Sequence, residues 1–311
     1  MESKNQSQTS EFILLGFGDL QERKAALFLL FLLIYLLTIT GNFLIALLVA
    51  YDKHLHTPMY FFLGNLSCLE ICYSSTLLPR ILASFISGNY VISVNVCLVQ
   101  HYFVGAFLAV ECYLLSVMSY DRYLAICKPL HYNTKMNGRF CLLMVIVSWV
   151  NGFLGSTLTI ANMSQLDFCG PNEIDHFFCD SFPIIDLSCS DTHVMKMVIY
   201  IVASVFTFPP FMFTLISYVL IIRAILQIAS TTGKQKTFST CSSHLFVVTL
   251  YYGSVVIVYA LPHTDRLKEL NKIFSVAYTI LTPLVNPLIY SLRNKEVKKA
   301  LACLLLGRSQ T

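Results

Sequence analysis

Seven long apolar stretches, separated by short polar segments, dominate the 311-residue sequence. A helix that crosses the hydrocarbon core of a membrane needs about 20 consecutive, mostly apolar residues. Stretches of this kind cover residues 25–50, 58–86, 94–127, 138–161, 194–223, 238–262 and 270–292. The pattern predicts an all-α membrane protein whose main domain, residues 25–292, is a bundle of seven transmembrane helices.

The composition supports a membrane environment. Hydrophobic residues make up 56% of the chain and charged residues only 12%, so a water-soluble domain of this size would lack the polar side chains to cover its surface. The first ten residues are polar and have no basic segment or small-residue cleavage site. We therefore expect no removable signal peptide, and a first span that directs its own insertion into the lipid bilayer.

The distribution of charge predicts the orientation, because Lys and Arg in short loops collect on the cytoplasmic side. With the C-terminus inside, the inner segments contain Lys53, Lys128, Lys135, Arg139, Arg223, Lys234, Lys236, Arg293, Lys295, Lys298, Lys299 and Arg308. The long outer loop at about 162–193 contains Asp167, Glu173, Asp175, Asp180, Asp186 and Asp191. The net charge of +4 thus reflects a basic inner face beside anionic lipid and gives no reason to expect nucleic-acid binding.

Three regions follow from this topology. Residues 1–24 form an extracellular N-terminal tail, residues 25–292 the membrane domain, and residues 293–311 a cytoplasmic tail that we expect to begin with a short amphipathic helix. Asn5 begins an Asn-Gln-Ser acceptor for N-glycosylation in the outer tail.

Four of the 11 cysteines face the oxidising side of the membrane. They are Cys97 at the outer end of the third span and Cys169, Cys179 and Cys189 in the outer loop. Two disulfides are expected, although four cysteines allow three pairings and these residues alone do not choose among them.

Two acidic residues lie within the apolar spans, where a charged group is costly and usually faces the bundle interior with a partner. Glu111 lies 11 residues before Arg122, and Glu70 lies 13 residues after Thr57. These separations put the carboxyls about 17 and 20 Å from the inner ends of their helices, nearly level with each other. They either share a cation, for which sodium is the candidate, or are protonated and hydrogen-bonded as packing groups. Neighbours that would complete the cluster are Asn42, Ser67, Ser116 and Asn286.

Helical spacing predicts a cavity above these acids. Residues three or four positions apart share a helix face, which groups Val104, Leu108 and Glu111 on the third span, Tyr252, Val255 and Tyr259 on the sixth, and Thr279, Pro283, Asn286 and Tyr290 on the seventh. A space between these faces would be mostly apolar with a few hydroxyl groups, which suits a small apolar ligand. A filled core without a cavity would give the same pattern.

Several motifs at the inner ends of the spans identify a family. Asp121-Arg122-Tyr123 lies in MSYDRYLAIC at 118–127 and resembles the signature of rhodopsin-like (class A) G-protein-coupled receptors. LHTPMYFFLGNLS at 55–67, KTFSTCSSHL at 236–245 and PLIYSLRN at 287–294 resemble the olfactory (odorant) receptor branch. The resemblance extends from residue 12 to residue 307.

The resemblance implies roles for particular residues. It implies disulfides between Cys97 and Cys179 and between Cys169 and Cys189, with Cys97–Cys189 as an alternative pairing. It implies a switch in which Asp121 holds Arg122 at rest and Arg122 turns toward the G protein on activation, with Tyr123, Tyr218 and Tyr290 as further members. It also implies an odorant pocket walled by Val104, Gly105, Leu108, Ala109, Val202, Phe206, Tyr252, Val255, Tyr259 and Thr279, and capped near Asp180 and Ser181.

The function that this resemblance implies is odorant detection. A small, mostly apolar volatile would bind within the bundle and activate a stimulatory heterotrimeric G protein, which raises cyclic AMP. The expected location is the plasma membrane as a multi-pass protein, in olfactory cilia, with no cofactor apart from the candidate sodium ion. A transporter or channel is the rival, with Glu70 and Glu111 as an ion pathway, but the two halves show no internal repeat. An enzyme is not expected, because no HExxH, GxSxG or phosphate-binding loop is present.

Overall fold

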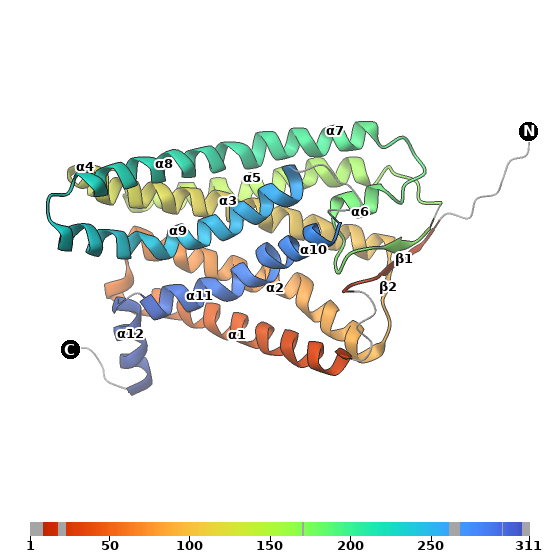
Figure 1. Cartoon of the computed structure of the whole chain (residues 1–311), viewed down its shortest axis with the longest axis horizontal. Helices are drawn as coiled ribbons and strands as arrows, with labels where there is room; N and C mark the ends of the chain where they lie inside the picture. The colour runs from red at the N-terminus through yellow and green to blue at the C-terminus, as the bar shows by residue number, and fades with distance from the viewer. Residues whose placement is uncertain (1–8, 18–22, 170, 261–267, 294, 307–311) are drawn as a thin grey trace, which may run out of the picture.

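The computed structural model describes residues 9–17, 23–169, 171–260, 268–293 and 295–306 (Figure 1). Within these ranges seven helical rods are long and apolar enough to cross a membrane. They are α1 (Lys24–Tyr51), α2 (Pro58–Ser87), α3 (Val94–Cys127), α5 (Gly138–Met163), the continuous rod of α7 (His193–Val202), η3 (Ala203–Thr207) and α8 (Phe208–Gln227), then α9 (Thr231–Ala260), and the rod of α10 (Lys268–Val276), η5 (Ala277–Leu281) and α11 (Thr282–Arg293). The predicted seven-helix bundle is confirmed.

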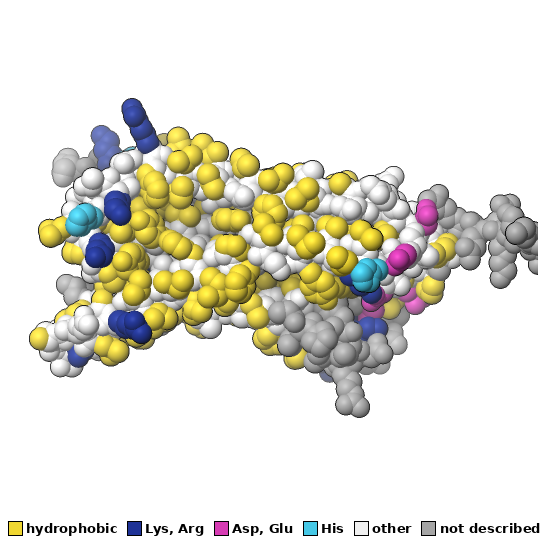
Figure 2. All heavy atoms as spheres, turned by 90° about the horizontal axis from the view of Figure 1, so that it is seen from above, with side chains coloured by type: hydrophobic (Ala, Val, Ile, Leu, Met, Phe, Trp, Pro, Cys, Tyr) yellow, Lys and Arg dark blue, Asp and Glu magenta, His cyan; other side chains and the backbone are white. Residues whose placement is uncertain are grey.

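The surface carries the charge asymmetry that the sequence predicts. On the face drawn in Figure 2, apolar side chains cover the middle of the bundle, Lys and Arg gather at one end, and Asp and Glu gather at the other. The basic end is the one where α11 and α12 (Lys295–Leu306) lie (Figure 1). The apolar band between two polar ends is the surface that a lipid bilayer requires of a spanning protein.

Helix α3 lies at the centre of the bundle and contacts α2, α5, α8 and α9. Its contact with α5 is close because Gly152 has no side chain. A Cβ at this position would lie 2.5 Å from Cγ2 of Val110 and 2.7 Å from the carbonyl oxygen of Ala106. The missing side chain therefore lets the backbones of α3 and α5 approach each other closely. Close approach of this kind favours packing between membrane helices.

The prolines in the spans explain the irregular turns of the helices. Pro287 has no N–H to donate to the carbonyl of Pro283, and the side-chain amide of Asn42 in α1 donates to that carbonyl instead, at 3.0 Å. The π-helical turns η3 and η5 lie directly before Pro209-Pro210 and Pro283. Wide turns of this kind occur where proline interrupts the regular hydrogen-bond ladder.

The fifth and sixth spans extend further into the cytoplasm than the apolar stretches indicate. Helix α8 continues to Gln227 and α9 begins at Thr231, whereas the apolar pattern ends at 223 and resumes at 238. The extra turns at the start of α9, residues 231–237, are polar, and a helix can keep its backbone hydrogen bonds in water without an apolar face. The predicted helix after the seventh span is present as α12, in which Val297 and Ala300 pack against Leu48 and Leu55.

The outer end holds a small sheet that the sequence did not predict. Strand β1 (Glu11–Leu14) pairs antiparallel with β2 (Val91–Ser93) and parallel with β3 (Glu173–Ile174), in the order β2-β1-β3. Residues 11–14, within the predicted N-terminal tail at 1–24, are therefore hydrogen-bonded to the outer loops. The available signal was the alternation in Glu-Phe-Ile-Leu, of which Phe12 and Leu14 are buried.

Candidate functional site

A cavity of about 120 Å³ lies in the outer half of the bundle, between α3, α5, the rod of α7, η3 and α8, α9 and the outer loop. Its lining consists of His101, Val104, Gly105, Leu108, Ala109, Gly155, Ser156, Thr159, Asp180, Ser181, Ile199, Val202, Ala203, Phe206, Thr207, Val255 and Tyr259. A cavity of about 150 Å³ in another protein accommodates benzene. The space therefore admits a small molecule on the order of six non-hydrogen atoms.

Eight of the ten residues predicted for an odorant pocket line this cavity. They are Val104, Gly105, Leu108, Ala109, Val202, Phe206, Val255 and Tyr259. The two residues predicted to cap it, Asp180 and Ser181, line it as well. The stripes predicted for the third and sixth spans thus border this space, whereas no described residue of the seventh span lines it. Contact with a ligand stays a prediction.

The remaining two predicted residues, Tyr252 and Thr279, lie outside the lining. The hydroxyl group of Thr279 donates to the carbonyl of Ser275 one turn earlier, at 2.6 Å. The hydroxyl group of Tyr252 donates to the carbonyl of Cys112 at 2.7 Å, and its ring packs against Phe211. Both hydroxyl groups donate to the protein's own carbonyls in this conformation, and their contact with a ligand stays a prediction.

The sequence interpretation missed the contribution of α5. Gly155, Ser156 and Thr159 line the cavity, and Gly152 is buried on the same face. These positions follow the i, i+3, i+4, i+7 spacing of one helix face. This stripe of small residues was the signal for an inward face. His101 and Ile199 were also missed, and they lie near the outer ends of α3 and α7.

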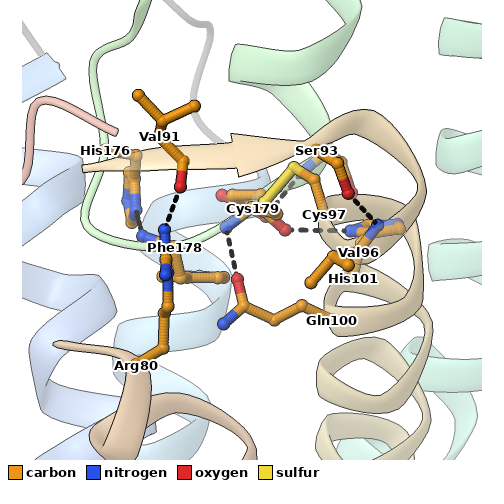
Figure 3. The surroundings of a disulfide bond; sticks show 12 residues. Arg80, Val91, Ser93, Val96, Cys97, Gln100, His101, His176, Phe178 and Cys179 are labelled. Atoms are coloured by element: carbon orange, nitrogen blue, oxygen red, sulfur yellow. Dashed lines mark hydrogen bonds between the residues drawn. A yellow bond between two sulfur atoms is a disulfide. The ribbon is translucent and has the colours of Figure 1, made fainter. Parts of the chain in front are cut away.

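The disulfide between Cys97 and Cys179 fixes the outer loop above the cavity (Figure 3). The backbone N–H of Cys179 donates to Oε1 of Gln100 at 3.1 Å, and its carbonyl lies 3.3 Å from Nδ1 of His101. A carbonyl only accepts, so the imidazole donates from Nδ1. Three contacts from successive turns of α3 therefore hold one residue of the loop.

Asp180 follows this fixed point and connects the loop to α9. One oxygen of its carboxylate accepts from the backbone N–H of Ser181 at 2.8 Å and from the hydroxyl group of Tyr259 at 2.9 Å. Burial raises the pKa of Asp180, and the two donated hydrogen bonds oppose that rise. The hydroxyl oxygen of Tyr259 also lies 3.3 Å from that of Tyr278. The cap of the cavity thus reaches both the sixth and the seventh spans.

His176 anchors the same loop through its ring. It stacks on Phe177 with centroids 4.7 Å apart and meets Phe178 edge to face at 4.5 Å. Burial lowers the pKa of His176 to about 3, the positive charge of Lys272 adds to the effect, and Asp175 opposes it. The imidazole is therefore neutral in the folded protein at neutral pH.

Two tyrosines join α9 to α3 directly below the cavity. The hydroxyl group of Tyr251 donates to the carbonyl of Leu108 at 2.5 Å, and that of Tyr252 donates to the carbonyl of Cys112. Leu108 itself lines the cavity. A ligand that displaces Leu108 would therefore also act on α9, because the backbone carbonyl of Leu108 accepts the hydrogen bond from Tyr251.

Below this level lie the two intramembrane acids. Glu70 and Glu111 are fully buried and interact with each other, which agrees with the equal depths derived from the sequence. The side-chain amide of Asn286 donates to Oε1 of Glu70 at 2.5 Å. Oε2 of Glu70 and both oxygens of Glu111 have no hydrogen-bond partner among the described residues. Of the other neighbours expected in this cluster, Asn42 bonds instead to backbone carbonyls at Thr38 and Pro283.

The inner end of α3 differs from the expected ion pair. The carboxylate of Asp121 accepts from the hydroxyl group of Tyr132 in α4 (Pro129–Lys135) at 2.8 Å. Among the described residues it forms no salt bridge with Arg122, because successive residues of a helix point in different directions. Nε of Arg122 is buried and has no hydrogen-bond partner in the described part of the chain. In this conformation Asp121 therefore does not hold Arg122 directly.

The other residues predicted for the switch lie around this point. The hydroxyl oxygen of Tyr218 in α8 is 2.5 Å from Nδ1 of His244 in α9, a partner that the sequence did not predict. The ring of Tyr123 stacks on Tyr120 with centroids 6.3 Å apart. The side chain of Tyr290 lies outside the described residues.

Both predicted disulfides are present with the pairing that the family resemblance implies. Cys97 bonds to Cys179 and Cys169 to Cys189, with Cα–Cα distances of 5.5 and 5.9 Å. The alternative pairing of Cys97 with Cys189 is thus wrong. The glycosylation acceptor at Asn5 lies outside the described residues.

Two larger hollows lie away from the bundle interior. One, of about 420 Å³, opens at the outer end between β1, α1, α2 and α10, and the salt bridge between Lys272 and Asp175 lies on its rim. The other, of about 730 Å³, lies on the flank of α1, α2 and α5 near the cytoplasmic end. Neither contacts the tyrosines that join α9 to α3, so the smaller interior cavity is the better candidate for a signalling ligand.

A family model and similar known proteins agree with one another. The family model described as "Olfactory receptor" matches residues 31–308. The chain is 48% identical over 308 residues to "Olfactory receptor 1f45" of Rattus norvegicus, covering 99% of this chain and 98% of that protein. It is 49% identical over 300 residues to "Olfactory receptor 11L1" of Homo sapiens, covering 96% and 93%, and 46% identical over 298 residues to "Olfactory receptor 5B21" of Mus musculus, covering 96% and 93%.

Proposed function

Because the chain belongs to the olfactory receptor family, a family of G-protein-coupled receptors and not of enzymes, we propose that it binds a small, mostly apolar odorant in the interior cavity and activates a stimulatory heterotrimeric G protein. The resulting signal is a rise in cyclic AMP. The protein is a multi-pass protein of the plasma membrane. Olfactory cilia are the expected site of expression.

The observation that carries this proposal is the direct connection between the cavity and α9. Leu108 lines the cavity, and its carbonyl accepts a hydrogen bond from Tyr251 of α9. The next contact inward, from Tyr252 to the carbonyl of Cys112, repeats the connection one turn below. Odorant contacts on α3 are therefore coupled to the helix whose inner end faces the G protein.

Activation follows from differential affinity. A ligand shifts a conformational equilibrium only as far as it binds one state better than the other. In this proposal the odorant favours the state in which the inner end of α9 moves outward from α8 and α3. Proline and the π-helical turns η3 and η5 supply the points where the rods bend.

The inner end has the chemistry to receive a G-protein helix. The guanidinium of Arg122 is partly enclosed and its Nε is unpaired among the described residues, so it can donate hydrogen bonds to a partner's carbonyl or carboxylate. On the face drawn in Figure 2, Lys and Arg side chains gather at this end of the bundle. The space that opens when α9 moves would accept an acidic or polar helix terminus.

The test is mutational. Arg122→Ala is expected to abolish odorant-driven cyclic AMP at equal surface expression, because the group that contacts the G protein is removed. Arg223→Ala is the matched control, since Arg223 is an exposed arginine on α8 at the same end of the bundle. Unchanged cyclic AMP in Arg122→Ala would contradict the switch role. A response that survives without the stimulatory alpha subunit would contradict the choice of G protein.

The acidic pair belongs to this proposal as a site for sodium or a shared proton. Three unpaired carboxyl oxygens and Oδ1 of Asn286 lie together in an apolar bundle. Such oxygens fit a small monovalent cation as ligands, and they equally fit a proton shared between two carboxyls. A transporter or channel reading of the pair predicts ion current through cells that express the protein, without any odorant.

A further inference from the structure

Most polar groups that line the cavity already donate their hydrogen atoms to other groups of the protein. Ser156 donates to the carbonyl of Tyr102 at 2.6 Å, Thr159 to that of Gly155 at 3.1 Å, and Tyr259 to the carboxylate of Asp180 at 2.9 Å. A hydroxyl has one hydrogen. What these three groups can still offer a ligand is their oxygen lone pairs.

His101 presents the same bias toward acceptance. Its Nδ1–H is engaged by the carbonyl of Cys179. The ring is 6% exposed and forms no salt bridge with a described residue, and an unpaired charge there would be costly. In the neutral ring the other nitrogen, Nε2, is an acceptor. Within the described part of the chain Nε2 has no hydrogen-bond partner, and His101 lines the cavity, so Nε2 is the acceptor that the ring can offer to a ligand.

Asp180 adds a second unmet acceptor. Both hydrogen bonds to its carboxylate arrive at Oδ1. Oδ2 has no partner within the described residues and is not sealed from the cavity. The side chain as a whole is 3% exposed, so bulk water does little to satisfy this oxygen.

Among the described residues, no Lys or Arg lines the cavity. Lys272 on the nearby α10 is held by Asp175 at 2.5 Å and by Glu269 at 3.3 Å, on the outer side of the loop. Ser181 and Thr207 also line the cavity, and their hydroxyl groups, which have no described partner, can turn to donate or accept. Because these two hydroxyl groups can do either, they do not change the conclusion that the cavity offers more acceptors than donors.

We propose that the ligand of this cavity carries a hydrogen-bond donor, as a compact alcohol or primary amine does. The donor group binds between Nε2 of His101 and Oδ2 of Asp180, and the hydrocarbon part of the ligand packs against Leu108, Phe206 and Val255. This inference rests on the proposed function, because it names the ligand class of the same cavity. Donor-free molecules of the same size, and carboxylic acids that are ionised at neutral pH, offer no hydrogen to either acceptor. A buried acceptor without a partner costs more than a hydrogen bond gains.

The experiment compares head groups on fixed carbon skeletons. Linear, branched and cyclic skeletons of five or six carbon atoms are each tested as the alcohol, the primary amine, the aldehyde and the carboxylic acid, and each alcohol is paired with an isomeric methyl ether. An alcohol and its isomeric ether have the same atoms and differ in the donor. We expect the alcohol or the amine to be the most potent member of every active skeleton. Its advantage over the ether should be at least about tenfold, equivalent to about 1.4 kcal/mol.

Two readouts separate this inference from the proposed function. Cyclic AMP in cells reports signalling, and thermal stabilisation of the purified full-length receptor reports binding without any G protein. Stabilisation by an alcohol or amine without a rise in cyclic AMP would contradict the proposed G protein and support the ligand class. Equal or better action of an ether, aldehyde or acid would overturn the ligand class, and so would the absence of binding by every compound in the series.

Matched variants locate the recognition. His101→Phe keeps an aromatic ring and removes the acceptor, so the ratio of potencies between alcohol and ether should fall to about one. His193→Phe makes the same exchange at an exposed position of α7 outside the cavity lining and should keep the ratio. A loss of the ratio in His193→Phe but not in His101→Phe would overturn the assignment. Because the ether comparison is made on the unaltered receptor, a folding defect in His101→Phe leaves the main test intact.

The amine arm distinguishes the two acceptors. A protonated amine that exceeds the alcohol identifies the charge of Asp180 as the dominant partner, and Asp180→Asn should then reduce the amine response more than the alcohol response. An alcohol that exceeds the amine identifies Nε2 of His101. Either order supports a donor-bearing ligand.

Discussion

The hydroxyl oxygen of Tyr218 in α8 lies 2.5 Å from Nδ1 of His244 in α9, and both side chains are buried near the inner end of the bundle. The ring of His244 also lies close enough to Arg122 for the guanidinium charge to act on it. The sequence gives no reason to pair these two residues, which are 26 positions apart on different helices. The bond ties together the two helices that separate in the proposed mechanism.

Replacing His244 by Phe should therefore raise cyclic AMP in the absence of odorant. The loss of a buried hydrogen bond worth about 1 kcal/mol shifts a two-state equilibrium by about fivefold. The measurement is basal cyclic AMP at matched surface expression, with Phe246→Leu, a change at an exposed apolar position of α9, as control. Basal activity at or below that of the unaltered receptor would mean that the bond belongs to the active state.

Gly152→Ala should destabilise the receptor. The added Cβ would meet the Ala106 carbonyl oxygen at 2.7 Å and the Val110 nitrogen at 3.0 Å, and backbone atoms move only if the helices separate. Overpacking of this kind costs about 1–3 kcal/mol. The purified variant should melt at a lower temperature and reach the surface in smaller amounts. Gly253→Ala is the control, because a Cβ there has nothing within 4 Å. Equal effects of the two substitutions would refute the close approach of α3 and α5.

Sodium should stabilise the receptor if the acidic pair holds a cation. Binding to the folded state at ten times the dissociation constant adds about 1.4 kcal/mol. The melting temperature is measured in sodium and in choline at constant ionic strength, for the unaltered receptor and for Glu70→Gln and Glu111→Gln. A sodium effect that both variants abolish supports the cation. The absence of any sodium effect in the unaltered receptor supports the shared proton.

His176 should make the receptor sensitive to acid. Its pKa falls from 6.5 to about 3 on folding, so below pH 6.5 the unfolded chain binds more protons than the folded one. Stability is therefore full above pH 6.5 and decreases as the pH falls toward about 3. The melting temperature measured at about pH 7.5 and about pH 5 should drop less in His176→Gln than in the unaltered receptor. His193→Gln, at an exposed position of α7, should preserve the full drop. An unchanged drop in His176→Gln would show that other groups, such as Asp180, dominate this range.

Seven apolar stretches of sufficient length, the basic inner segments and the DRY-type motif at 121–123 determined the seven-helix architecture, the orientation and the family by themselves. These properties are local, because insertion into a bilayer depends on the length and polarity of each segment. The equal depth of Glu70 and Glu111 was also derivable, since the rise per residue of a helix is constant. Eight of the ten expected pocket residues lie where helical spacing and family resemblance put them.

Tertiary structure alone decided which polar atoms remain free. Tyr252 and Thr279 have hydroxyl groups that suit a ligand, yet each donates to a carbonyl within the bundle. Asp121 bonds to Tyr132 instead of to the adjacent Arg122, and the N-terminal segment at Phe12 pairs with two distant strands. The physical reason is that a hydrogen bond depends on positions within a few tenths of an ångström. Helix periodicity fixes which face a residue occupies, whereas packing between helices fixes the partner it finds there.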